Sequence, residues 1–260
     1  MNDMRFKPVA NLIMILIIMF SIIIIGMSVE PYMKDVDAKP SGEIKDTFVT
    51  FDYNGTWYSV NYELNVGIAE YYIDYQIPRS FNKSCYSAFA SQYDIGVRNV
   101  AKEMKILTED MNDVDTVNMV SKLVNVIVQY KADEPDLLGS AEYYQYPEET
   151  LYLRTGDCED YAILTVAILR EMGYDAEVMV SYEHSLAGVN IEGEGKSTTS
   201  ISGTRYYTLD SAGGHTVGDY DGYIFVMDRD VMICKILLLT IVILLAFVVL
   251  VAKDEGKRMV

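Results

Sequence analysis

Two apolar stretches, one near each end of the chain, constrain its fold more than any other feature. Residues 9–27 and 232–252 are apolar apart from two and three polar residues respectively. Each has roughly the 20 residues that an α-helix needs to cross about 30 Å of hydrocarbon. We therefore expect two transmembrane helices. A secretory signal peptide is the alternative for the first, but its apolar run exceeds the usual ~7–15 residues and no small-residue cleavage site follows.

Basic residues flank both stretches on the sides toward the chain ends. Arg5 and Lys7 precede the first, and Lys253, Lys257 and Arg258 follow the second. Because Lys and Arg concentrate on the cytoplasmic side of a membrane, the tails at 1–8 and 253–260 are predicted to be cytoplasmic. The region from about residue 28 to 231 then lies outside the cell membrane, between two anchors.

The charge of the chain lies in this middle region. The whole chain has a formal net charge of −17, and residues 28–231 alone carry −20. Such a surface repels phosphate backbones and anionic lipid headgroups, so no nucleic-acid partner is expected. Cationic peptides, divalent cations and a salty medium are all compatible with it, and a solvated surface that keeps the domain soluble is the simplest interpretation.

Cys158 stands at the predicted start of a helix. It follows Gly156, precedes an apolar run over residues 162–169, and Gly173 marks the helix end. Unpaired N–H groups and the macrodipole at a helix N-terminus favour the nucleophilic thiolate, although the neighbouring acidic residues oppose it. His184 and Asp210 follow at successive gaps of 26 residues. A thiol, an imidazole and a carboxylate are the parts of a catalytic triad.

The segments around these residues carry a family resemblance. Residues 142–151 (EYYQYPEETL) and 156–160 (GDCED) resemble the transglutaminase-like superfamily, most closely its archaeal and bacterial membrane-anchored "ETL…GDCED" branch. The resemblance continues through residues 164–180, the His184 segment and the two tyrosines before Asp210, covering roughly residues 114–220. Members of this branch often carry a glutamate and two threonines at the third triad position, where this chain has Asp210, Ser211 and Ala212. Residues 192–203 resemble an insertion.

The resemblance implies an α+β fold with a papain/transglutaminase-like core, in which a Cys-bearing helix packs on an antiparallel sheet. The expected order along the chain is a transmembrane helix at 9–27, a stalk at 28–45, a small antiparallel β region at 46–90, the transglutaminase-like domain at 91–231 and a second transmembrane helix at 232–252.

The resemblance also implies roles for the site residues. Cys158 would attack a carbonyl carbon, His184 would carry the proton, and Asp210 would orient the imidazole. The Cys158 N–H is one oxyanion donor, and Tyr144, Tyr146 and Asp157 are oxyanion or cleft candidates. The expected function is a membrane-anchored extracytoplasmic thiol enzyme that cleaves or transfers acyl groups at amide bonds of peptides or proteins. The alternative is an inactive cell-surface binding or scaffold module on the same fold.

Other interpretations of the site residues stay open. His215 follows two glycines in a turn and reads as a surface residue, so His184 is the preferred base. A Cys85–Cys158 disulfide would remove the nucleophile. No cofactor is expected. Glu159 and Asp160 are weak candidates for Ca²⁺ ligands, but the acidic residues lack EF-hand spacing and more simply bond backbone groups and line the cleft.

Local patterns predict the remaining elements. Residues 47–53 and 56–62 are aromatic and β-branched around Asn54-Gly55, a strong signal for a type I′ hairpin, and 71–77 are predicted as a third strand. Residues 94–131 have a helical pattern, and strands are expected at 176–180, from 184 onward and at 206–209. Asn54 and Asn82 begin N-glycosylation sequons.

Overall fold

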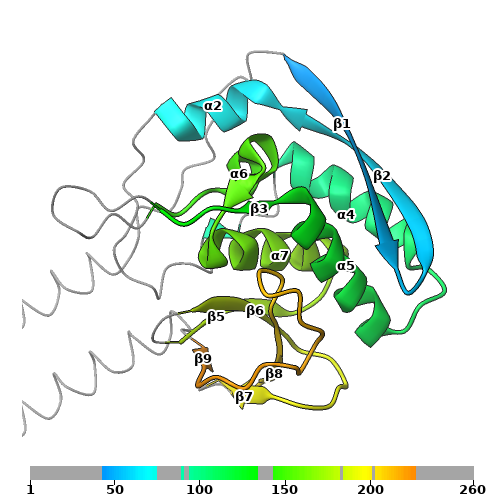
Figure 1. Ribbon diagram of the computed structural model, residues 1–260, viewed down its shortest axis with the longest axis vertical. Helices are drawn as coiled ribbons and strands as arrows, with labels where there is room; N and C mark the ends of the chain where they lie inside the picture. The colour runs from blue at the N-terminus through cyan, green and yellow to red at the C-terminus, as the bar shows by residue number, and fades with distance from the viewer. Residues whose placement is uncertain are drawn as a thin grey trace, which may run out of the picture. The chain divides into compact units, whose positions relative to one another are not determined.

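The computed structural model describes residues 43–74, 89–90, 94–133, 143–181, 184–200 and 203–226. Its elements follow one another as shown in Figure 1: β1 Ile44–Tyr53, β2 Thr56–Asn65, α2 Val66–Asp74, α4 Ile95–Leu107, α5 Asp113–Ile127, β3 Gln129–Tyr130, α6 Pro147–Leu153, β4 Thr155–Gly156, α7 Cys158–Met172, β5 Ala176–Val180, β6 Ser185–Val189, β7 Ser197–Thr199, β8 Arg205–Leu209 and β9 Phe225–Val226. The predicted membrane spans at 9–27 and 232–252, the cytoplasmic tails and most of the stalk lie outside the described residues. None of the helices in the described ranges combines the length and apolar character that crossing a bilayer requires.

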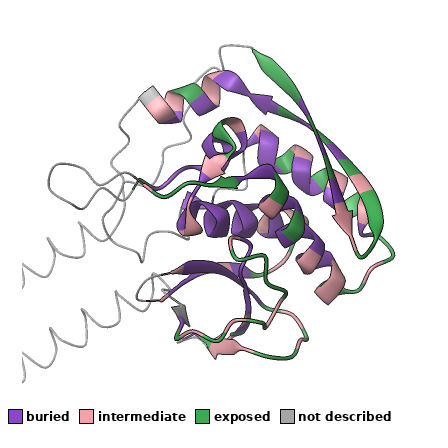
Figure 2. Ribbon diagram, viewed as in Figure 1, coloured by how far each residue is buried: buried purple, intermediate pink, exposed green. Residues whose placement is uncertain are grey.

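Helix α7 lies between two layers of the fold. Residues 162–169 are all buried, and Figure 2 shows burial along most of the helix. A helix that is apolar on every side must be covered on every side. Helices α4, α5 and α6 pack against it on one side, and strands β5 and β6 on the other (Figure 1). It ends at Gly173, whose φ of 103° is left-handed; the Gly173 and Tyr174 N–H groups donate to the carbonyls of Arg170 and Leu169.

The sheet beside α7 has the order β7-β8-β6-β5-β9. All of its described pairings are antiparallel. The expectation of a Cys-bearing helix packed on an antiparallel sheet is therefore confirmed, as are strands at 176–180 and 206–209. Strand β7 lies within the insertion at 192–203 and pairs with β8, so the insertion adds a strand at the edge of the sheet.

The predicted hairpin is also confirmed. Strands β1 and β2 pair antiparallel from Ile44↔Asn65 to Tyr53↔Thr56. The turn residues Asn54 and Gly55 have φ values of 52° and 79°, as a type I′ turn requires. One face of the ribbon is buried against α4 and α5.

Two local predictions need correction. The third strand at 71–77 is wrong, because residues up to Asp74 belong to helix α2. Val66, Ala69 and Tyr72 are buried at a spacing of three residues, which is the face of a helix; the aromatic residues had suggested a strand. The helical pattern at 94–131 is two helices, and Asn112 starts the second by accepting a hydrogen bond from the Asp115 N–H at 2.8 Å.

A buried carboxylate joins three of these elements. Glu148 in α6 is fully buried and accepts hydrogen bonds from the N–H groups of Asn65 and Gly96, both at 2.8 Å. A Cβ on Gly96 would lie 2.6 Å from Glu148 Oε2, so this contact requires glycine. The buried Asp94 accepts from the Tyr72 hydroxyl at 3.1 Å. Burial, reinforced by the negative charge of Asp94, raises the pKa of Glu148 to about 7, and burial raises the pKa of Asp94 to about 6.

These raised pKa values predict a pH-dependent stability. Between about pH 4.5 and 7 the native state holds protons that the unfolded chain has released, so the free energy of unfolding falls as pH rises through that window. Glu148→Gln is expected to flatten this dependence by about 3 kcal/mol at most, while losing one of the two accepted hydrogen bonds. Denaturant unfolding from pH 5 to 8 measures the change. The exposed Glu63→Gln is the matched control, and an unchanged slope in Glu148→Gln would contradict the assignment.

Candidate active site

The start of α7 is fixed by a buried carboxylate in its first turn. Asp160 Oδ2 accepts from the Asp157 N–H at 3.2 Å, and Oδ1 accepts from the Gln145 N–H at 2.8 Å. A Cβ on Gly156 would lie 2.6 Å from Asp160 Oδ2, so only glycine fits there. The first and last residues of the GDCED segment thus hold Cys158 at the first position of the helix.

His184 and Asp210 form a hydrogen-bonded pair. The distance from His184 Nε2 to Asp210 Oδ2 is 3.0 Å. His184 directly precedes β6 and Asp210 directly follows β8, and these strands pair with Ala187 opposite Leu209. Antiparallel pairing therefore brings the start of one strand beside the end of the other. The N–H and hydroxyl of Ser181 both donate to the His184 carbonyl, at 2.7 and 3.1 Å.

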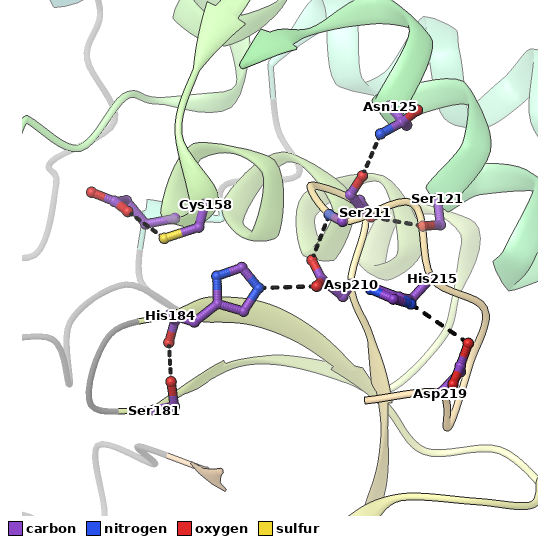
Figure 3. Close-up of polar contacts among 11 residues, drawn as sticks. Ser121, Asn125, Cys158, Ser181, His184, Asp210, Ser211, His215 and Asp219 are labelled. Carbon is purple, nitrogen blue, oxygen red and sulfur yellow. Dashed lines mark hydrogen bonds and ion pairs between the residues drawn. The ribbon is translucent and has the colours of Figure 1, made fainter. Parts of the chain in front are cut away.

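The loop that carries Asp210 is anchored to two helices. Asn125 of α5 donates to the Ser211 carbonyl at 2.8 Å. The Ser211 hydroxyl lies 3.0 Å from that of Ser121 in α5 and 2.8 Å from that of Thr165 in α7. Figure 3 shows the contacts of Ser211 with Ser121 and Asn125, beside Asp210. The loop that carries the Asp210 carboxylate is thus held by hydrogen bonds from two helices as well as by its connection to strand β8.

The contacts of Asp210 keep it ionised. Burial acts to raise its pKa, but the hydrogen bonds from His184 and the Gly213 N–H, with the adjacent imidazoles, hold the pKa below its usual value. A carboxylate that accepts from His184 Nε2 places the imidazole proton on that nitrogen. The other ring nitrogen, Nδ1, is then the free acceptor.

Cys158 faces the histidine segment but bonds to its own neighbour. In Figure 3 the imidazole lies between Cys158 and Asp210, with its second nitrogen on the Cys158 side. The Ser185 N–H, next in the chain to His184, also donates to the sulfur. The thiol itself donates to Glu159 Oε2 at 3.1 Å. The described contacts thus bring His184 and Asp210 together and place Cys158 against the same strand.

This environment raises the pKa of the Cys158 thiol above its usual value. Burial is the largest cause, and the charge of Glu159 and its hydrogen bond add to it, while the Ser185 N–H acts in the opposite direction. The expectation that the helix N-terminus would favour thiolate is wrong for this geometry, because burial and a carboxylate in contact outweigh the dipole. The pKa of Glu159 is itself raised to about 10, by burial and by contact with Asp157.

The structure places the remaining predicted site residues in different environments. Tyr144 and Tyr146 are buried and pack against Phe89, so an oxyanion role for either stays a prediction. His215 is 49 % exposed and lies 3.5 Å from Asp219, as expected of a surface residue. Asp160 uses both oxygens on backbone donors, as the simpler interpretation of these acidic residues expects, and a Ca²⁺ role for it stays a prediction.

Two further predictions concern cysteine pairing and glycosylation. Cys158 is a free cysteine, so the alternative of a Cys85–Cys158 disulfide is not realised. Asn54 is exposed at the hairpin turn, and its glycosylation stays a prediction. Cys85 and Asn82 lie outside the described residues.

Sequence reasoning missed the residues that hold the loop of Asp210. Ser121 and Asn125 lie four residues apart on α5, within a run of buried apolar residues, and this isolated polar pair was the available signal. Tyr220, whose ring stacks on His184 with centroids 5.7 Å apart, had no signal in the sequence, because it lies on an irregular segment beyond β8.

Comparisons with known proteins identify a family for part of the chain. Residues 96–211 match the family model described as a transglutaminase-like domain. The chain is similar to a candidate cysteine protease from Cytophaga hutchinsonii (15% identity, 71% of this chain and 73% of that one, TM-score 0.33). It is also similar to a structure described as a TGase (16%, 69% and 47%, TM-score 0.34). No curated protein gives a significant match. The matched segment contains Cys158, His184 and Asp210 and belongs to the transglutaminase-like superfamily.

The contact between Cys158 and Glu159 predicts how the thiol titrates. Glu159→Gln removes the ionisable neighbour and is expected to lower the thiol pKa, since the negative charge in contact disappears. Each unit by which the thiol pKa falls gives about a tenfold rise in thiolate, and hence faster alkylation by iodoacetamide, above about pH 10, where Glu159 of the wild type carries its charge. The pH dependence of labelling, resolved by peptide mass spectrometry, measures it. The exposed Glu192→Gln should leave the rate unchanged; equal rates in both variants would refute the effect of Glu159.

Proposed function

We propose that this protein is a thiol acyl-transfer enzyme that cleaves or transfers acyl groups at amide bonds of peptides or proteins. The observation that carries the proposal is the 3.0 Å contact between His184 Nε2 and the buried Asp210 carboxylate, on a strand whose next N–H donates to the Cys158 sulfur. Membership of the transglutaminase-like superfamily supports the same reaction class.

The hydrogen bond between His184 and Asp210 fixes which imidazole nitrogen carries the proton, and this supports a defined order of steps. His184 Nε2–H donates a hydrogen bond to the Asp210 carboxylate, so Nδ1 can accept the thiol proton. Rotation about the Cα–Cβ bond of Cys158 would move the thiol from Glu159 toward that nitrogen. The thiolate then forms a bond to the carbonyl carbon, and the imidazolium gives its proton to the leaving amine as the C–N bond breaks.

The acyl-enzyme is then resolved by a second nucleophile. His184 takes a proton from water, which gives hydrolysis, or from a primary amine, which gives transamidation; the bond to sulfur breaks and the thiol is restored. The N–H of Cys158, at the start of α7, is one donor for the oxyanion. Asp210 stays ionised throughout and stabilises the imidazolium.

Triad variants test the proposal directly. Cys158→Ala and His184→Ala are expected to abolish turnover, and Asp210→Asn to lower it by about 10²–10⁴-fold, because the wrong imidazole tautomer is favoured. Turnover is measured on a peptide library, as new amino termini for hydrolysis and as incorporation of a fluorescent primary amine for transamidation. His215→Ala is the matched control and should retain activity.

Turnover by the Cys158→Ala variant at the rate of the wild type would reject the assignment as a thiol enzyme. Absence of turnover in a folded wild type, across both assays, would favour the inactive cell-surface module. The resting contact of Cys158 with Glu159 rather than with an imidazole is the observation that keeps this second function in view.

We also propose that the domain acts at the cell surface, with its peptide or protein substrates outside the membrane. The support is the sequence: two apolar stretches at 9–27 and 232–252, basic residues beyond them and an acidic middle. Protease added to intact cells is then expected to degrade the middle region while tags on both termini survive. Loss of a terminal tag with survival of the middle would reverse the orientation.

A further inference from the structure

The thiol of Cys158 lies in a cluster with two carboxylates that have no role in the proposed reaction. Asp157, Cys158 and Glu159 each present one ligand atom, and all three atoms lie within 4.8 Å of one another. Figure 3 shows the sulfur turned toward the carboxylate it contacts, on the side away from Asp210. The proposed reaction needs the thiol at the imidazole, so the carboxylates need another explanation.

Each carboxylate in this cluster keeps one buried oxygen without a hydrogen-bond partner, while its other oxygen accepts from the Asp133 N–H (Asp157 Oδ2, 3.4 Å) or from the Cys158 thiol (Glu159 Oε2, 3.1 Å). Glu159 is 3 % exposed, and its Oε1 has no hydrogen-bond partner. Asp157 Oδ1 is likewise buried without a partner. The raised pKa of Glu159 means that it holds a proton at neutral pH, which it can donate to Asp157, but the pair still carries one negative charge. Buried charges of one sign are normally paired or coordinate a metal, and the described salt bridges bring no Lys or Arg to these two residues.

The set of donor atoms selects the kind of cation. One sulfur and two carboxylate oxygens suit Zn²⁺, with Zn–S near 2.3 Å and Zn–O near 2.0–2.2 Å. Tetrahedral bonds of that length place ligand atoms about 3.4–3.6 Å apart. The three ligand atoms lie within 4.8 Å of one another, with 3.1 Å between the sulfur and Glu159 Oε2, so a small rearrangement would reach that spacing. Ca²⁺ and Mg²⁺ take oxygen ligands and would gain nothing from the thiolate.

We propose that Asp157, Cys158 and Glu159 form a Zn²⁺-binding site that withholds Cys158 from reaction. Binding releases the protons of the Cys158 thiol and of the Glu159 carboxyl to solvent and forms a Zn–S bond and two Zn–O bonds, with water at the remaining position. The sulfur is then held on the Glu159 side, away from His184. The metal site stands by itself, whereas its effect as a reversible block of turnover rests on the proposed function.

Protection from alkylation tests the site without any substrate. Iodoacetamide labelling of Cys158 in the full-length protein is followed by peptide mass spectrometry, with and without buffered free Zn²⁺. We expect at least tenfold slower labelling with Zn²⁺ and no protection by Ca²⁺ or Mg²⁺. Each variant is compared with its own rate in the absence of metal, so a changed intrinsic reactivity does not enter.

Three variants distinguish this site from a Zn²⁺ site that Cys158 would share with His184. Glu159→Gln and Asp157→Asn should lose most of the protection; Asn caps a helix about as well as Asp, so α7 is preserved. His184→Ala should keep the protection, and the exposed Glu192→Gln should behave as wild type. Loss in His184→Ala with retention in Glu159→Gln would mean that the metal bridges Cys158 and His184, which overturns the proposal. Retention in both carboxylate variants, or no protection in wild type, overturns it as well.

A second readout measures binding directly. Competition with a chromogenic Zn²⁺ chelator should show one equivalent bound by wild type and by His184→Ala, and markedly weaker binding by Cys158→Ala. If the protein binds Zn²⁺ in this way but shows no turnover, the proposed metal site stands and the proposed enzyme function is rejected. A protein with turnover but no thiol-dependent binding would do the reverse.

Discussion

The carboxylate of Asp160 fixes where α7 begins, and the site is built outward from that point. One oxygen bonds the Asp157 N–H within the helix start and the other bonds the Gln145 N–H on the segment that leads into α6. Because Gly156 lies against this carboxylate, the chain before Cys158 has little freedom. The sulfur is therefore carried by the fixed end of a buried helix, which is the positioning that the proposed reaction would require of its nucleophile.

The partners of Cys158 are held by different means. Strand pairing places His184 beside Asp210, and two helices behind the sheet hold the loop after β8. This division leaves the electrostatics of the site asymmetric. On one side of the imidazole an ionised carboxylate is stabilised by several donors, while on the other the thiol meets acidic residues that suppress its ionisation. The thiol is thus held in its protonated form, and in the proposed reaction its activation depends on moving it from Glu159 to the imidazole.

Much of this fold follows from local sequence signals. The apolar run at 162–169 with its terminal glycine defines α7, the Asn54-Gly55 turn defines the hairpin, and alternation defines β5. The same signals fail where packing decides. Helix α2 is rich in tyrosine, yet it is helical because one face packs on α6. Ser121 and Asn125 gain their role only because the loop after β8 returns to α5. The thiol pKa depends on burial and on one carboxylate rotamer, which no pattern in the chain encodes.

The fully buried Glu148 has a consequence for how the molecule assembles. Its two donors come from the end of β2 and the start of α4, which are 83 and 52 residues away along the chain. The segment matched by the family model starts at Gly96, so one donor lies within it and the other before it. A shortened chain that began at residue 96 would leave this carboxylate half-satisfied in an apolar core. The hairpin and the layers that carry Cys158, His184 and Asp210 should therefore form in one cooperative transition, and proteolytic loss of the hairpin should unfold the candidate site rather than merely expose it.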